Sequence, residues 1–265
     1  MWTDVFTPLR WCYRGLLLLL QSTVFLVPTV LLQGRLGHAV TLGDRSLAEW
    51  ALNRWSGFTC RVFGIRTQVF GAPREGPVLI VANHISWADI QALHSVAAMS
   101  FVGKAEIAEW PLMGYLASKG KTIYHRRGSH DSANGVVAQM LEQLGSGGRV
   151  AIFPEGGILP GEHIKRFHAR MFKVAVEAGC PIQPVMIRYV RDGKVDPDVT
   201  FLAGENFVQN ILRLMGRPAC TAQLWFLPTF APHNQPRNPL AARAEEAVKE
   251  AFARTDTLDA RPGHG

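Results

Sequence analysis

Residues 78–89 read VLIVANHISWAD, and this stretch gives the first indication of the fold. Its apolar half, Val78 to Ala82, has the length and composition of a buried strand and stops at the polar pair Asn83-His84. A carboxylate, Asp89, follows at the expected start of a helix. A buried strand that passes through a polar turn into a helix is the repeating unit of α/β proteins.

The sequence after Gly76 repeats this pattern. Strands are predicted at 78–82, 100–103, 122–125, 150–154, 182–189, 199–202 and 220–226, and helices at 88–98, 106–118, 132–144, 169–178, 207–215 and 239–253. The alternation predicts an α/β fold with a mostly parallel central sheet covered by helices. Ligands of such sheets bind beyond the carboxyl ends of the strands, so we expect the chemistry just after the strands.

The N-terminal segment is strongly apolar. No charge occurs from Gly15 to Leu32, a stretch that as a helix would be roughly 27 Å long, just short of the ~30 Å hydrocarbon core of a bilayer. Three interpretations stay open: a membrane-spanning helix, a helix or bent hairpin lying in one leaflet, and a cleaved signal peptide.

The segment from Ser46 to Phe63 is amphipathic and carries Trp50 and Trp55, as is typical of a helix at a membrane interface. An ordinary helix packed on a core is the alternative. We therefore predict N-terminal membrane-attachment helices at 1–64, an α/β domain at 65–255 and a flexible tail at 256–265.

The charge balance favours anionic partners. Lys and Arg number 28 against 21 Asp and Glu, for a net charge of +7. This excess suits membrane lipids or phosphorylated substrates, and attachment to the anionic cytoplasmic face of the inner or plasma membrane. No nucleic-acid-binding motif accompanies it, so a nucleic-acid partner is not expected. The four cysteines (Cys12, Cys60, Cys180 and Cys220) are widely spaced, which predicts reduced, mostly buried thiols and no metal site.

Two polar motifs follow predicted strands. His84 is suited to act as a general base, and Asp89 to orient its ring, although a capped helix start with no catalytic role explains the same spacing. The second motif, VAIFPEGG at 150–157, places Glu155 beside two glycines that leave room for an anion or a ligand. A plain turn at a strand end is its alternative.

Cations follow two further strands. Lys104 comes after the second strand, and Arg126 and Arg127 come after the third. Each alone is most often a solvated charge. Together, at one expected sheet edge and near a histidine and a glutamate, they resemble a clamp for phosphate.

These residues carry a family resemblance. The set Asn83-His84-x-Ser86-x-x-Asp89, Lys104, Arg126, Phe153-Pro154-Glu155-Gly156 and Val185-Met-Ile187 after Pro184 resembles the sequence blocks of PlsC-type glycerolipid acyltransferases, in the family's order. These are the lysophosphatidic acid and lysophospholipid acyltransferases. The resemblance spans roughly residues 76–190.

The resemblance implies a role for each position. His84 would take the proton from the acceptor hydroxyl as that hydroxyl attacks an acyl thioester, and Asp89 would orient His84. Arg126 would bind the acceptor's phosphate with help from Lys104, and Glu155 and Gly156 would belong to the acceptor-binding block. No cofactor or metal is implied. The acyl donor, acyl-CoA or acyl-carrier protein, is a substrate, and no covalent acyl-enzyme is required.

One departure bears on the acceptor. After the glutamate block many members continue Thr-Arg-Ser, whereas this chain has Gly157-Ile-Leu-Pro-Gly161. Either Lys165, Arg166 or Arg170 replaces the missing arginine, or the headgroup is not a plain phosphate monoester. The expected function is a membrane-bound O-acyltransferase that converts 1-acylglycerol-3-phosphate to phosphatidic acid. A lyso-ornithine lipid or another lysolipid is the alternative acceptor, and a hydrolase or a non-catalytic lipid-binding protein is the alternative class.

Overall fold

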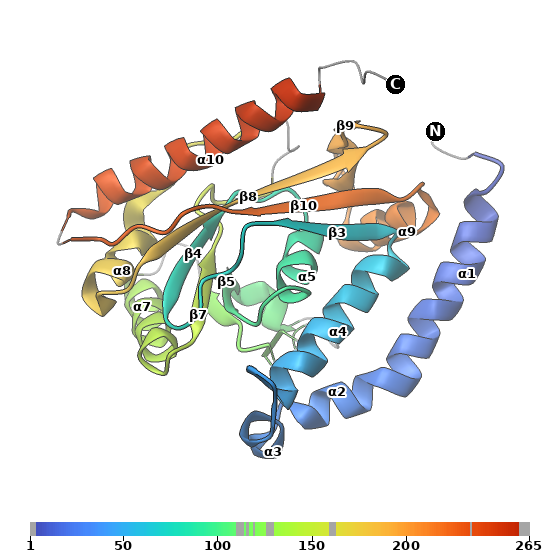
Figure 1. Cartoon of the computed structure of the whole chain (residues 1–265). Coiled ribbons are helices and arrows are strands. Elements are labelled where there is room, and N and C mark those ends of the chain that lie inside the picture. The colour runs from blue at the N-terminus through green and yellow to red at the C-terminus, as the bar shows by residue number, and fades with distance from the viewer. Residues whose placement is uncertain are drawn as a thin grey trace.

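The computed structural model describes residues 4–109, 114, 117–118, 120–125, 130–158, 163–233 and 235–259. A central sheet has helices on both of its faces (Figure 1). Its strands lie in the order β3 (Ile65–Phe70), β10 (Cys220–Phe226), β8 (Ile182–Arg191), β4 (Val78–Ala82), β7 (Arg149–Ile152), β5 (Ser100–Lys104) and β6 (Ile123–His125), and the short β9 (Lys194–Val195) pairs with β8.

The sheet is mixed but mainly parallel. All pairs from β8 through β4, β7 and β5 to β6 are parallel, whereas β10 is antiparallel to β8 and parallel to β3. The fold prediction is therefore confirmed. The parallel part brings the carboxyl ends of β4, β7, β5 and β6 to one edge.

The strand β4 lies at the centre of the molecule and is buried along its whole length. Val78, Ile80 and Ala82 face one core cluster, and Leu79 and Val81 face the other. This is the period-two alternation of a strand covered on both faces, which explains why the sequence reads as a continuous apolar run.

Different helices cover the two faces. The first cluster lies under α4 (Leu47–Val62), α5 (Ala88–His94) and α9 (Phe207–Gly216), and the second under α7 (His130–Gly145), α8 (Lys173–Ala178) and α10 (Arg237–Asp259). Short 3-10 segments are found at Ala105–Glu109, Ala169–Phe172 and Pro197–Val199.

Some sequence predictions were wrong. The predicted strand at 199–202 is a 3-10 turn followed by irregular chain, and its apolar character comes from Val199, which is buried in the first core cluster. The strand β3 was missed because its residues alternate irregularly in burial, as at a sheet edge. The helix α10 continues to Asp259, beyond the predicted end at 253.

Cys60, Cys180 and Cys220 are buried free thiols, whereas Cys12 is exposed.

The apolar N-terminal segment is one long helix with a wide turn inside it. The helices α1 (Thr7–Leu20) and α2 (Leu26–Leu32) are joined by the π-helical turn Gln21–Phe25. Pro28 has no N–H to donate to the carbonyl of Val24, and the π-helical turn lies just before this gap. By length and composition alone, Thr7–Leu32 could cross a membrane.

Three polar side chains dock this helix on the domain. Thr7, Arg14 and Gln21 recur every seven residues and are its buried positions, while leucines and other apolar residues on its remaining surface are exposed. Arg14 donates to the carbonyls of Leu214 (3.2 Å) and Met215 (3.0 Å), and also to that of Arg217, at the end of α9. A short helix α3 (Arg35–Ala39) and a hairpin of β1 (Thr41–Leu42) and β2 (Arg45–Ser46) lead to α4.

The helix α4 packs between this N-terminal helix and the domain. It buries small residues such as Ala48, Ala51 and Cys60 against α5 and the sheet, and Trp50 is exposed. This inner face has the packing of a core helix, the alternative that the sequence left open.

Candidate active site

The loop after β4 carries the candidate catalytic pair. Nδ1 of His84 lies 2.8 Å from Oδ2 of Asp89, and the Asp89 side chain is fully buried. Asn83 fixes the start of the loop: its amide donates to the carbonyl of Ile187 (2.9 Å) and accepts from the N–H of the same residue (2.8 Å). The position of His84 is therefore set by β4 and its neighbour β8.

The buried carboxylate of Asp89 has four donors around it. Besides the His84 ring, Oδ2 accepts the backbone N–H groups of Ile85 (2.7 Å) and Ser86 (3.0 Å). Oδ1 accepts the hydroxyl of Tyr189 from β8 at 2.8 Å. A buried carboxylate needs this number of partners. Asp89 therefore binds the loop backbone and the His84 ring at the same time, and its role in catalysis stays a prediction.

The ring of His84 is held on its face as well as at its edge. It stacks on Phe153 with ring centroids 3.9 Å apart and an angle of 13° between the planes. Because Nδ1 is directed at Asp89, the proton of the neutral ring lies on Nδ1 and the lone pair on Nε2. The side chain is 15% exposed, so Nε2 is the nitrogen available to a substrate.

Glu155 joins the two sequence motifs. It is 7% exposed, and its carboxylate accepts the backbone N–H of His84 at 2.7 Å and that of Lys165 at 2.9 Å. Burial raises the pKa of Glu155, and the two backbone hydrogen bonds oppose this rise. Gly156 has a φ of 77°, and a Cβ there would meet the His168 ring at 3.4 Å. The acceptor-binding role of Glu155 and Gly156 stays a prediction.

Of the predicted cations, the structure describes Lys104. Lys104 ends β5, is exposed, and pairs in register with His125, the last residue of β6. Arg126 and Arg127, which follow β6, lie outside the described residues. The phosphate-binding role of Lys104 and Arg126 therefore stays a prediction.

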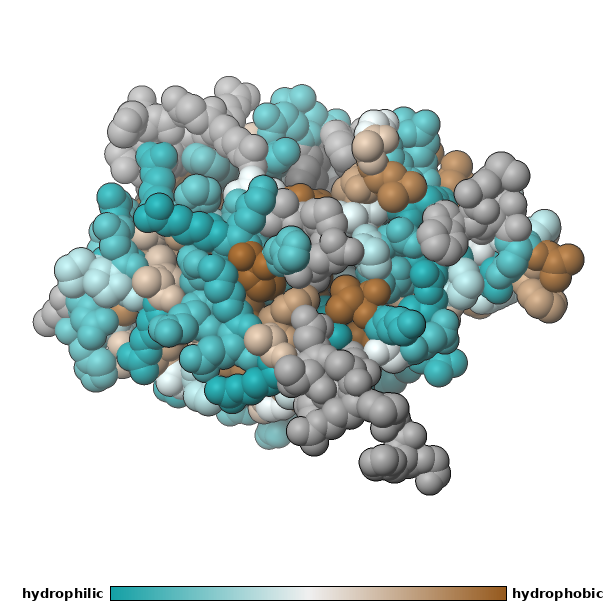
Figure 2. Space-filling model, turned by 90° about the horizontal axis from the view of Figure 1, so that it is seen from above, coloured by the Kyte–Doolittle hydropathy of each residue, from teal (hydrophilic) through white to brown (hydrophobic). Residues whose placement is uncertain are grey.

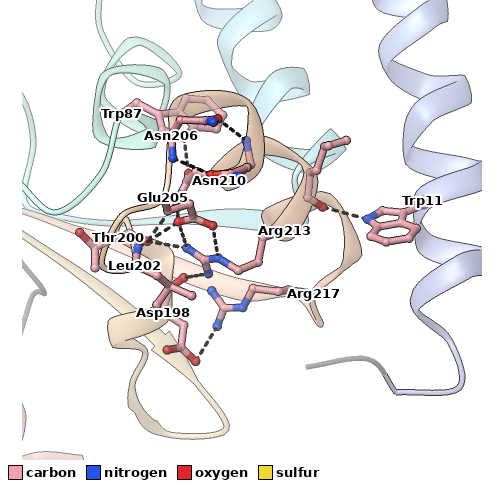
Figure 3. A network of polar contacts seen from close by, with 12 residues as sticks. Trp11, Trp87, Asp198, Thr200, Leu202, Glu205, Asn206, Asn210, Arg213 and Arg217 are labelled. Atoms are coloured by element: carbon pink, nitrogen blue, oxygen red, sulfur yellow. Dashed lines mark hydrogen bonds and ion pairs between the residues drawn. The ribbon is translucent and has the colours of Figure 1, made fainter. Parts of the chain in front are cut away.

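The helix α9 connects this loop with the N-terminal helix (Figure 3). Asn210, which is fully buried, accepts the indole N–H of Trp87 at 2.8 Å and donates to Glu205 at 2.9 Å. Two residues further on, the carbonyl of Leu212 accepts the indole N–H of Trp11 at 2.8 Å. The segment between His84 and Asp89 is thus braced from outside by a helix on which α1 rests.

Sequence reasoning missed several of these groups. Tyr189 and Asn210 show no motif of their own, and Phe153, although part of the block Phe153–Gly156, was given no role toward His84. The one available signal was the position of Tyr189 two residues after the block Val185–Ile187, in the same predicted strand.

The fold and the site define an α/β enzyme class with a histidine–aspartate pair at the carboxyl edge of a mainly parallel sheet. A family model described as "Acyltransferase" matches residues 67–188. The chain is 37% identical over 217 residues to a lyso-ornithine lipid O-acyltransferase of Pseudomonas aeruginosa, covering 82% of each chain. The chain therefore belongs to the PlsC-type glycerolipid acyltransferase family and is an acyltransferase.

Two other similarities are informative. A 1-acyl-sn-glycerol-3-phosphate acyltransferase of Neisseria gonorrhoeae is 35% identical over 112 residues, which cover 42% of this chain and 44% of the relative. The crystal structure of the 1-acyl-sn-glycerophosphate acyltransferase PlsC from Thermotoga maritima matches with a TM-score of 0.65 over 97% of this chain and 99% of that one. The sequence identity in this match is 21%, so it bears on the fold alone.

Proposed function

We propose that the protein transfers a fatty acyl group from an acyl thioester to the free hydroxyl of a lysolipid, with His84 as general base. The 2.8 Å bond from Nδ1 of His84 to the fully buried Asp89 supports this proposal most directly. It leaves Nε2 free to accept a proton and places a carboxylate where it stabilises the resulting imidazolium.

The proposed reaction balances without a covalent enzyme intermediate. Nε2 of His84 takes the hydroxyl proton while the hydroxyl oxygen attacks the thioester carbonyl. The tetrahedral intermediate collapses, the carbon–sulfur bond breaks, and the leaving thiolate takes the proton back from His84. The products are a new ester and a free thiol, and the histidine returns to its starting state.

The acceptor is either 1-acylglycerol-3-phosphate, the expectation from the sequence, or a lyso-ornithine lipid. Two observations favour the second. The relative matched over 82% of its length carries that name, and residues 157–161 lack the Thr-Arg-Ser continuation expected in many members of the family. Ornithine carries a carboxylate and an amino group and no phosphate, so it does not require the missing arginine.

We propose that the N-terminal helix lies along the membrane surface on the cytoplasmic side. Thr7, Arg14 and Gln21 hold one stripe of the helix on the domain, and the exposed stripe carries Leu16, Leu19 and Leu31. An amphipathic arrangement of this kind suits a helix in the interface plane. It also brings the end of β4 near the lipid from which the acceptor comes.

An acceptor panel tests the proposed function. The purified chain is incubated with acyl-CoA or acyl-carrier protein and with each lysolipid, and products are identified by mass spectrometry. A diacyl product from the lyso-ornithine lipid in preference to 1-acylglycerol-3-phosphate is expected. A diacyl product only from the phosphate acceptor, with a raised acceptor KM in Arg126→Ala, would reverse the choice of acceptor. Release of free fatty acid would indicate a hydrolase. The absence of any product with either donor would indicate a non-catalytic lipid-binding protein.

A further inference from the structure

A basic pocket lies on the face of the sheet opposite the N-terminal helix. It has a volume of about 740 Å³ and lies between the segment after residue 165 and α10. Six of its lining residues carry charge or can carry it: Arg166, His168, Arg170, Lys173, Arg237 and Glu245. We call this site the basic pocket.

The positive charge of the basic pocket is only partly compensated: Lys173 lies 3.5 Å from Glu177, one turn on along its helix. The one carboxylate that lines the pocket, Glu245, already accepts the N–H of Phe167 at 2.9 Å and the ammonium of Lys249 at 2.5 Å. Within the described residues, the side chains of Arg170 and Arg237 have neither an ion pair nor a hydrogen bond with protein. Like charges that converge without counter-ions repel one another and attract a polyanion.

The basic pocket is joined to the catalytic loop by a short path. The N–H of Lys165 bonds to Glu155, which also holds the N–H of His84. Three residues later, the N–H of His168 donates to the carbonyl of Pro154 at 2.9 Å, and the His168 ring lies over Gly156. The segment that lines the pocket is thus fixed to the same loop that positions the base.

The location indicates which substrate the basic pocket serves. The exposed apolar residues of α1 lie on the other face, with α4 and α9, which is the side from which a lipid acceptor comes under the proposed function. The view from above, onto α10, shows a mainly hydrophilic surface over the left half of the molecule (Figure 2). A ligand that enters on this face comes from water, and the charge of the basic pocket favours an anion.

We propose that the basic pocket binds the phosphorylated nucleotide of an acyl-CoA donor, an inference that rests on the proposed function. Coenzyme A carries a diphosphate and a 3′-phosphate, which match a cluster of four cations. The volume falls within the roughly 300–1,000 Å³ of ordinary small-molecule sites. The long pantetheine arm then carries the thioester past His168 and Gly156 toward His84.

Binding measurements on the full chain in detergent test the proposal independently of catalysis. Titration calorimetry compares coenzyme A, 3′-dephospho-coenzyme A and pantetheine with wild type, the double variant Arg170→Gln/Arg237→Gln and the control Arg254→Gln. Arg254 lies on the same helix α10 as Arg237 but outside the basic pocket. The double variant should bind coenzyme A at least about tenfold more weakly, as expected for lost charge-assisted contacts, and pantetheine equally well. Wild-type affinity of the double variant for coenzyme A would overturn the proposal even if transfer activity is present.

Steady-state kinetics separate the donor from other sources of phosphate. The double variant should show a raised KM for acyl-CoA, with an unchanged acceptor KM and unchanged activity with an acyl-pantetheine thioester. A raised acceptor KM alone would assign the basic pocket to the lysolipid headgroup. An effect seen only with acyl-carrier protein would assign it to an acidic protein surface. Either result would overturn the proposal. Absence of transfer in wild type would count against the proposed function, and the calorimetry would then still show whether the basic pocket binds coenzyme A.

Discussion

The hydroxyl of Tyr189 donates to Oδ1 of Asp89 at 2.8 Å, the carboxylate oxygen that His84 does not contact. Burial, and then the adjacent Asp89, raise the pKa of Tyr189 well above its usual value, so the hydroxyl stays a donor throughout the working range. The phenol therefore holds the orienting carboxylate from the side opposite the base.

Replacing this tyrosine tests that arrangement. Tyr189→Phe removes one donor from a buried carboxylate and should lower the free energy of unfolding by about 1.5–3 kcal/mol. Because Asp89 is then less firmly held, kcat should fall severalfold while the acceptor KM changes little. Wild-type kcat together with lowered stability would show that Tyr189 serves the fold alone.

The base assignment makes the strongest prediction for activity. His84→Ala should lower kcat by at least about a hundredfold, the range for loss of a general base. Membrane association should persist, because the N-terminal helix makes no contact through His84. His163→Ala, at an exposed histidine, is the matched control. Retention of most activity by the His84 variant would exclude it as the base.

Glu155 is predicted to act through His84. In Glu155→Gln, one oxygen that accepts a backbone N–H is replaced by an NH₂ group, which faces that N–H donor to donor. We expect a loss of stability of about 1–3 kcal/mol and a lower kcat, measured by denaturant unfolding and by initial rates. If Glu155 instead binds the acceptor directly, the acceptor KM will rise with stability unchanged.

The docking of the N-terminal helix depends on Arg14. Arg14→Ala leaves the carbonyls at the end of α9 without their donor and should reduce stability by about 2–4 kcal/mol. Hydrogen exchange should speed up in α1. Gly64→Ala should do the same, because a Cβ there would lie 2.1 Å from the Arg14 guanidinium. Arg35→Ala, at an exposed arginine on α3, should change neither quantity.

A buried histidine should make stability depend on pH. Burial lowers the pKa of His94 to about 4, from 6.5 in an exposed ring, and Nδ1 has no hydrogen-bond partner in the described part of the chain. As the pH falls below 6.5, His94 becomes protonated in the unfolded chain, whereas in the folded chain it stays neutral until about pH 4. Stability is thus lost across this window, by about 2 kcal/mol at pH 5.

Thermal unfolding at pH 7 and pH 5 checks this expectation. The fall in Tm between the two pH values should be smaller in His94→Leu than in wild type. His163→Gln should behave like wild type. Equal falls in all three proteins would mean that His94 is protonated in the fold or that its ring is not enclosed.

The sequence predicted site residues best where a polar residue interrupts the periodic pattern of a strand or helix. His84 and Glu155 stand out because they come just after buried strands, and Asp89 because it lies at the start of a helix. Their spacing also matches the sequence blocks of the acyltransferase family. Tyr189 could not be found in this way, since it lies 100 residues from Asp89 along the chain and belongs to none of these blocks. The edge strand β3 was invisible for a related reason: pairing with β10, and not its own pattern, makes it a strand.

The contacts of Arg14 can form only late during synthesis of the chain. Its acceptors at 214–217 are about 200 residues away along the chain, so they leave the ribosome long after α1 has emerged. Until then α4 is the protein surface available to the leucine-rich helix, through Gln21 and the contacts of α2. If the helix lies on the membrane as proposed, the nascent chain meets the bilayer before its α/β domain is complete, and Arg14 closes onto α9 as a late step of folding.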